Sequence, residues 1–98
     1  MTHYVALIED AGPDFTIGVW FPDLPGCFSA GDSIDDAIVN ASEAVALWFE
    51  HSEEERRTVP RPRLPSEIKA DPEIATELGR YVLALIPAPD IALQPAAE

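Results

Sequence analysis

The chain has 98 residues, a formal net charge of −12 and a hydrophobic content of 47%. This length fits one small domain, and this apolar content argues against global disorder. No apolar run approaches the ~18–20 residues of a transmembrane helix, and the N-terminus lacks the pattern of a signal peptide. The single cysteine, Cys27, cannot form an internal disulfide, which is typical of a reducing compartment. We therefore expect a cytoplasmic location.

The acidic charge is unevenly distributed, because no Lys or Arg occurs before Arg56. Such a surface repels the phosphates of nucleic acids and attracts basic proteins, although a need for solubility explains acidic charge equally well. Arg56, Arg57, Arg61 and Arg63 form a small basic patch, for which we expect pairing with Glu53–Glu55 rather than binding to nucleic acid.

The first half of the chain predicts an antiparallel meander and a long helix. Tyr4–Ile8 is apolar on both faces, as in a central strand. Residues 15–21 alternate with a period of two, which predicts a strand whose core face carries Phe15, Ile17, Val19 and Phe21. Residues 34 to about 52 place apolar side chains at helical spacing, with Trp48 in the apolar stripe.

A junction joins these elements between Phe21 and Ala37, with the sequence FPDLPGCFSAGDSIDDA. Pro22 ends the second strand, because proline donates no hydrogen bond to a sheet. Pro25 and Gly26 predict a turn, and residues 27–31 return as a short strand that ends at Gly31. Ser33 is the expected N-cap of the long helix, with acidic residues in its first turn.

The second half predicts a proline-rich linker over 59–65, a short helix capped by Ser66 and another that opens at Pro72 and ends near Gly79. Residues 80–86 form the last strand, which a right-handed crossover would place parallel to the first. The predicted class is α+β, with one domain over 1–87, a flexible tail over 88–98 and no C-terminal DNA-binding segment. One helix leaves Val5, Leu7, Thr16 and Trp20 uncovered, so we expect a homodimer or a higher homo-oligomer.

The sequence offers little for catalysis. Glu9, Asp10, Asp23 and Asp32 end strands or lie in turns, where carboxylates mostly cap or stay solvated, so we expect no metal site and no other cofactor. His3, His51 and Cys27 lack the spacing of ligands or of a nucleophile with its base. We therefore predict that the protein is not an enzyme.

Four segments together resemble the HicB-like antitoxin family: His3–Glu9, Phe15–Phe21, the junction, and the run Asp-Asp-Ala-Ile-Val-Asn-Ala at 35–41. The resemblance implies a partial ribonuclease-H-like fold and an antitoxin that binds and neutralises a HicA-type RNA-cleaving toxin. Many relatives also carry a C-terminal DNA-binding segment. Nothing after residue 65 resembles one, so direct DNA binding is not expected.

The toxin-binding candidates are the acidic residues at and near the helix start, with one aromatic residue: Asp23, Asp32, Asp35, Asp36, Glu43 and Trp20. Trp20 is either a core residue or an interface anchor, and the sequence leaves both open. The alternative function is a stand-alone oligomeric module that binds a small molecule or another protein without a toxin.

Overall fold

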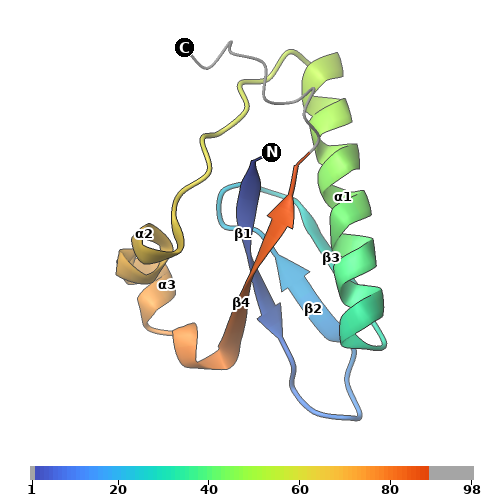
Figure 1. Cartoon of the computed structure of the whole chain (residues 1–98), viewed down its shortest axis with the longest axis vertical. Helices are drawn as coiled ribbons and strands as arrows, with labels where there is room; N and C mark the ends of the chain where they lie inside the picture. The colour runs from blue at the N-terminus through green and yellow to red at the C-terminus, as the bar shows by residue number, and fades with distance from the viewer. Residues whose placement is uncertain (1, 89–98) are drawn as a thin grey trace.

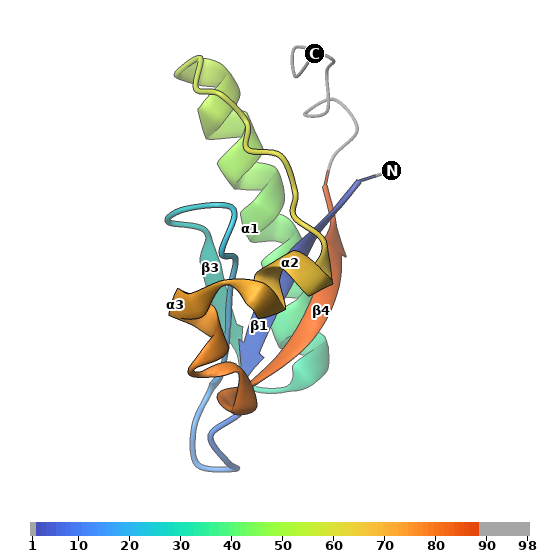
Figure 2. The same ribbon diagram turned by 90° about the vertical axis from the view of Figure 1, so that its left-hand side faces the viewer.

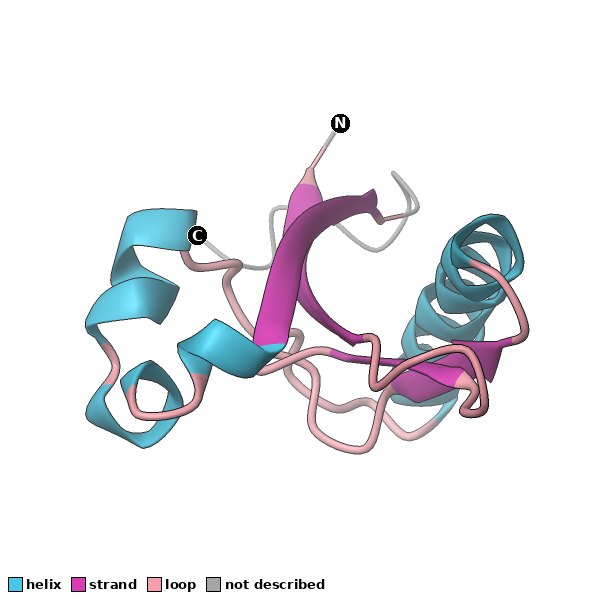
Figure 3. Cartoon of the chain, turned by 90° about the horizontal axis from the view of Figure 1, so that it is seen from below, coloured by secondary structure: helices cyan, strands magenta, loops and turns pink. Residues whose placement is uncertain are grey.

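The computed structural model describes residues 2–88, which form a twisted sheet with helices on both faces (Figure 1). The elements in chain order are β1 (His3–Glu9), β2 (Ile17–Trp20), β3 (Phe28–Gly31), α1 (Ile34–Glu54), α2 (Pro65–Ala70), α3 (Pro72–Ala75), the 3₁₀ turn η1 (Leu78–Arg80) and β4 (Tyr81–Pro87). The long helix α1 covers one face, and α2 and α3 cover the other (Figure 3). The predicted meander and the long helix are confirmed.

The sheet has the strand order β3-β2-β1-β4, and every neighbouring pair is antiparallel. In the central strand β1, Leu7 pairs with Trp20 on one side and with Leu83 on the other. The prediction that the last strand runs parallel to the first is therefore wrong. The all-antiparallel sheet does not confirm the partial ribonuclease-H-like fold.

The direction of β4 follows from the path of residues 55–80. The helix α1 carries the chain from the end of β3 to the opposite end of the sheet, where a strand beginning at once would have run parallel to β1 (Figure 1). Instead the chain descends along the other face through α2 and α3 (Figure 2). Tyr81 consequently pairs with Glu9, at the end of the sheet where β1 finishes.

Alternate side chains of β1 point toward α1 and form the larger core. Tyr4, Ala6 and Ile8 are buried there together with Ile17 and Val19. The helix contributes small residues near its start and larger ones further along, and all are buried: Ala37, Ala41, Val45 and Phe49. This spacing confirms the apolar stripe predicted for the helix.

The prediction that Phe15 belongs to the core face of β2 is wrong, because its side chain is 65% exposed. The strand begins only at Ile17. The N–H of Phe15 donates to the carbonyl of Gly12 at 3.1 Å, and Gly12 has φ of +123°. A turn therefore holds Phe15 outside the sheet, although its spacing continues the alternation.

A second core fills the opposite face of the sheet. Val5 and Leu7 of β1 are buried against Ile68 of α2 and Ile74 of α3. Trp20 is half-buried beside this cluster, and Thr16 is exposed outside β2. The prediction that the chain itself leaves Val5, Leu7 and Trp20 uncovered is wrong, since α2 and α3 supply this cover.

The junction after β2 contains the turn predicted at Pro25 and Gly26, and a second turn precedes it. The N–H of Leu24 donates to the carbonyl of Phe21 at 3.2 Å, and the N–H of Cys27 donates to that of Leu24 at 3.0 Å. Gly26 adopts φ of +82°, a conformation that suits glycine and agrees with the Pro25-Gly26 turn. The strand ends at Trp20, just before the segment that contains Pro22.

Gly31 and Ser33 attach β3 to the start of α1. A Cβ on Gly31 would lie 2.4 Å from the backbone nitrogen of Ala37, so a side chain there would collide with the first turn. Ser33 is the N-cap, as predicted, and its Oγ accepts the N–H of Asp36 at 3.1 Å. The side-chain amide of Asn40 donates to the carbonyl of Ala30 at 2.8 Å and ties the helix to the strand.

Ser33→Ala is expected to lower the free energy of unfolding by ~1 kcal/mol, because it removes this cap. Ser66→Ala is the matched control, since Ser66 is exposed and lies inside α2 rather than at its cap. Urea denaturation of both variants measures the difference. Equal midpoints for the two variants would refute the capping role of Ser33.

The short helices differ in detail from the prediction. Ser66 does not cap α2, because the helix begins at Pro65 and the N–H of Leu64 donates to Oε1 of Glu67 at 2.7 Å. Pro72 opens α3, as predicted, and Asp71 caps it by accepting the N–H of Glu73 at 2.9 Å. This helix ends at Ala75, so η1 rather than one continuous helix reaches Gly79.

The two ends of the described chain lie side by side. Ala88 is buried, and its N–H donates to the carbonyl of Thr2 at 2.8 Å, which extends the pairing of β1 with β4. The rest of the tail predicted over 88–98 lies outside the described residues.

Candidate functional site

Four of the predicted toxin-binding residues gather at the start of α1, the lower end of the helix in Figure 1. Asp32 precedes the helix, Asp35 and Asp36 lie in its first turn, and Glu43 follows two turns later. All four are exposed. Asp35 and Asp36 also favour the helix itself, because negative charge stabilises the positive end of its dipole.

Exposed apolar residues interleave with acidic ones on the outer surface of α1. Positions 36, 39, 43, 47 and 50 follow the three- and four-residue spacing that places side chains on one helix face. We call this surface the acidic helix face; it comprises Asp36, Val39, Glu43, Leu47 and Glu50. Val39 is 56% exposed and Leu47 is 53% exposed, so both are available to a partner.

The toxin-binding residues predicted from the sequence do not include Val39, Leu47 or Glu50. The sequence does contain a signal for Val39 and Leu47, since both are large apolar residues on the polar side of an amphipathic helix. Apolar anchors ringed by charge are typical of protein interfaces.

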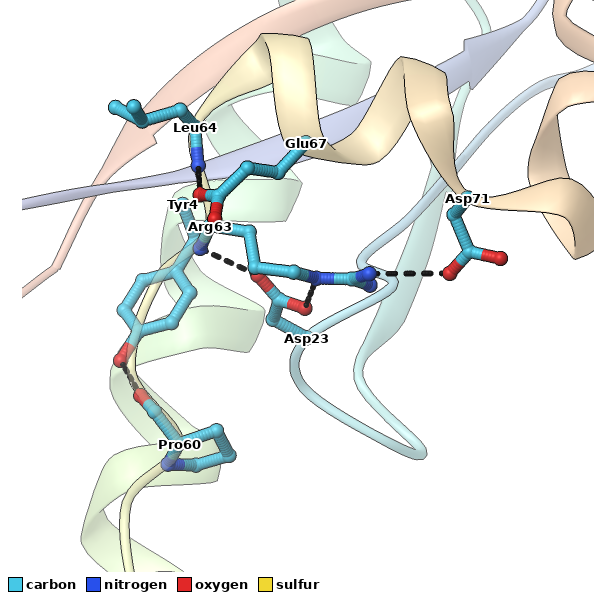
Figure 4. Close-up of polar contacts among 7 residues, drawn as sticks. All are labelled: Tyr4, Asp23, Pro60, Arg63, Leu64, Glu67 and Asp71. Atoms are coloured by element: carbon cyan, nitrogen blue, oxygen red, sulfur yellow. Dashed lines mark hydrogen bonds and ion pairs between the residues drawn. The ribbon is translucent and has the colours of Figure 1, made fainter.

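Asp23 lies apart from these residues and makes internal contacts (Figure 4). Its Oδ1 accepts the Nε–H of Arg63 at 2.7 Å, and its Oδ2 accepts the backbone N–H of Arg63 at 2.8 Å. The guanidinium of Arg63 also donates to Oδ2 of Asp71 at 3.0 Å. Only 8% of the Asp23 side chain is exposed. This Asp23–Arg63–Asp71 bridge ties the loop after β2 to the segment that carries α2 and α3.

The Asp23–Arg63–Asp71 bridge shifts the pKa values of two of its side chains. Hydrogen bonds from Arg63 lower the pKa of Asp71, and the two carboxylates raise the pKa of Arg63. Nearby, the hydroxyl of Tyr4 donates to the carbonyl of Pro60. Burial, followed by the charge of Asp23, raises the pKa of Tyr4 to about 12. The linker is thus held against the sheet by polar contacts at two points.

The two tryptophans have structural contacts. Trp20 packs edge-on against Tyr81, with ring centroids 5.8 Å apart, beside the second core. Trp48 lies on the core stripe of α1, as predicted, and its Nε1–H donates to the carbonyl of Pro25 at 2.9 Å. Both rings therefore stabilise the domain, and the packing of Trp20 favours its interpretation as a core residue.

Within residues 2–88, no three His, Cys, Asp or Glu side chains cluster as metal ligands would. Cys27 is buried, and burial raises the pKa of its thiol to about 11, so the unreactive protonated form prevails near neutral pH. In the same range, no helix is both long enough and apolar enough to span a bilayer.

Within residues 2–88, three of the arginines make ion pairs. Arg57 lies 2.6 Å from Glu55, which agrees with the expected pairing in the basic patch. Arg63 belongs to the bridge described above, and Arg80 pairs with Glu9 at 2.9 Å. Arg56 adopts φ of +58° and closes α1, because the N–H groups of residues 56 and 57 donate back to carbonyls of the last turn. The end of α1 is therefore closed by backbone hydrogen bonds.

Comparisons with known proteins give the family. A profile described as "HicB_like antitoxin of bacterial toxin-antitoxin system" matches residues 4–92. The chain is 33% identical over 67 residues to "Antitoxin HicB 2" of Photorhabdus laumondii, covering 68% of this chain and 47% of that protein. It is 38% identical over 58 residues to an "uncharacterized 14.9 kDa protein in rep-hol intergenic region" of Haemophilus phage HP1, covering 59% of this chain and 42% of that protein. The chain thus spans less than half the length of these two relatives.

Solved structures share the fold. The crystal structure of the Burkholderia pseudomallei antitoxin HicB superposes with a TM-score of 0.76 at 30% identity, covering 97% of this chain and 69% of that chain. A chain of the HicA3 and HicB3 toxin-antitoxin complex superposes with a TM-score of 0.70 at 29% identity, covering 90% of this chain and 99% of that chain. With a family match over most of its length, the chain belongs to the HicB-like antitoxin family.

Proposed function

We propose that the protein is an antitoxin that binds and neutralises a HicA-type RNA-cleaving toxin. The observation that carries this proposal is the likeness to a chain of the HicA3 and HicB3 complex, which covers 90% of this chain. The exposed acidic residues at the start of α1 add a surface suited to a basic partner. The protein acts by occupying the toxin and has no catalytic role of its own.

The acidic helix face is the proposed docking surface. Its carboxylates, with Asp32 and Asp35 beside them, steer a basic toxin toward α1, and burial of Val39 and Leu47 supplies affinity. Asp23 and Trp20 are left out of this surface, because the first is held by Arg63 and the second packs against Tyr81.

The charge pattern favours a protein partner over DNA. Residues 2–55 contain no Lys or Arg, and three of the five later arginines lie in ion pairs within residues 2–88, which leaves them less available to phosphates. We therefore propose that the described residues do not contact DNA directly and that the protein meets its toxin in the cytoplasm.

Glu43→Lys is expected to slow association with a HicA-type toxin by roughly two- to ten-fold at low salt. Glu43 lies beyond the first turn of α1, so the change leaves the helix dipole contribution of Asp35 and Asp36 intact. Stopped-flow association rates at low and high salt measure the effect, and the difference between wild type and variant should shrink as salt rises.

Glu73→Lys is the control. It makes the same change in net charge but lies on α3, on the opposite face of the sheet from α1. Its association rate should stay near that of the wild type. Association rates that respond neither to Glu43→Lys nor to salt would contradict steering by the acidic helix face.

A further inference from the structure

The outer edge of β4 carries backbone groups without a neighbouring strand within residues 2–88, since β4 ends the order β3-β2-β1-β4. The Ala88 N–H donates to Thr2 and so points toward β1. Because backbone groups alternate in direction along an antiparallel strand, the N–H and C=O groups of Leu83 and Leu85 point outward. The backbone groups of Tyr81 and Pro87 also point outward, although Pro87 has no N–H and cannot donate a hydrogen bond.

The side chains of this edge are free of charge from Tyr81 to Pro87. Val82 is 64% exposed and lies beside Ile8, on the face toward α1. Leu85 is 54% exposed and lies beside Val5, on the face toward α2 and α3. Edge strands of monomeric proteins are usually protected by charges or bulges, and β4 has neither in its pairing with β1.

We propose that β4 pairs edge to edge with β4 of a second copy of this chain, antiparallel and centred on Ala84. In this register Leu83 lies opposite Leu85 of the second copy. The backbone N–H of each residue donates to the backbone C=O of the other, which gives two hydrogen bonds per pair. Val82 lies opposite Ile86, so apolar side chains meet on both faces. The two sheets become one continuous sheet, and Pro87 falls at the end of the pairing, where its missing N–H matters least.

Exposure on both faces of β4 favours a strand as the occupant. A partner docked on one face of the sheet would cover either Val82 or Leu85, whereas a strand added at the edge contacts both. α1 packs mainly on β3 and β2, so it leaves the edge of β4 open for a neighbour (Figure 2).

Charge favours a second copy over the toxin at this edge. Each copy carries a net charge of −12, so two copies meet with least repulsion along an uncharged strand. A basic partner is instead drawn to the acidic helix face on α1. The inference does not depend on the proposed antitoxin function, because the test uses the protein alone.

The test is the mass in solution by light scattering at tens of micromolar. The wild type should have twice the 10.7 kDa mass of the chain. Leu85→Lys should give the monomer mass, because it places a charge in the interface. Leu47→Lys is the matched control, since Leu47 on α1 is 53% exposed, and it should remain a dimer. Circular dichroism confirms that both variants are folded.

A cross-link tests the register. Ala84→Cys should form a disulfide between copies on oxidation, because directly opposite residues of this kind lie within disulfide range. Ala46→Cys is the control and should form no such disulfide, because Ala46 is exposed on α1, away from β4. The wild type should form none either, because Cys27 is buried. A monomeric wild type, a dimeric Leu85→Lys, a monomeric Leu47→Lys or an Ala84→Cys dimer without the cross-link would each overturn the proposal.

Discussion

Ile68→Ala is expected to lower the free energy of unfolding by about 2–5 kcal/mol. Ile68 is fully buried between α2 and the sheet, where it packs with Val5, Leu7 and Ile74. Truncation leaves a cavity in a small core that has few other large side chains to fill it. The loss is measured by chemical denaturation followed by circular dichroism.

Leu64→Ala is the control for this experiment. Leu64 directly precedes α2 but is 63% exposed, so its truncation should cost no more than about 0.5 kcal/mol. If the two variants were equally stable, α2 would not cover the sheet as described. The Ile68→Ala variant should also bind the hydrophobic dye ANS, because loosening α2 exposes Val5 and Leu7.

Arg63→Met is expected to cost roughly 1–3 kcal/mol at neutral pH, because it leaves the nearly buried carboxylate of Asp23 without its partner. The low to middle part of this range is expected, since 35% of the Arg63 side chain is exposed and solvent screens the pair. Arg57→Met is the control: its ion pair with Glu55 is exposed on both sides, so the loss should be about 0.5 kcal/mol or less.

The effect of Arg63→Met should depend on pH. Arg63 lowers the pKa of Asp71 in the folded chain relative to the ordinary value, so folding favours the ionised carboxylate. This contribution is present above the unfolded pKa of about 3.9 and is lost as the pH falls through the lower folded value. The stability difference between wild type and Arg63→Met should therefore shrink below about pH 4. A difference that stays constant on acidification would contradict the role of the bridge.

Local features of the sequence predicted the junction and α1 well. The positions of Pro25, Gly26 and Ser33 determine a turn and a cap through their own backbone chemistry, and neighbours in the sequence suffice to predict them. The apolar spacing of α1 likewise gave its core face, because that face depends only on the period of the helix.

Features that depend on distant segments could not be predicted in the same way. The direction of β4 depends on which end of the sheet residues 55–80 reach, and a proline-rich linker carries no signal for that choice. Asp23 looked like a surface carboxylate in a turn, yet its partner Arg63 lies 40 positions further along the chain. Phe15 followed the strand alternation, but the turn at Gly12 overrides that pattern.

The position of β4 also has a consequence for how the chain folds during synthesis. The central strand β1 is made first, but its partner on one side, β4, is made last among the described elements, so their pairing joins Glu9 to Tyr81 and His3 to Pro87. Contacts between such distant residues carry a large loop-closure entropy and slow folding. A nascent chain that ends before Tyr81 would leave one edge of the apolar strand β1 unpaired. Folding of this domain is thus coupled to synthesis of the polypeptide through residue 87.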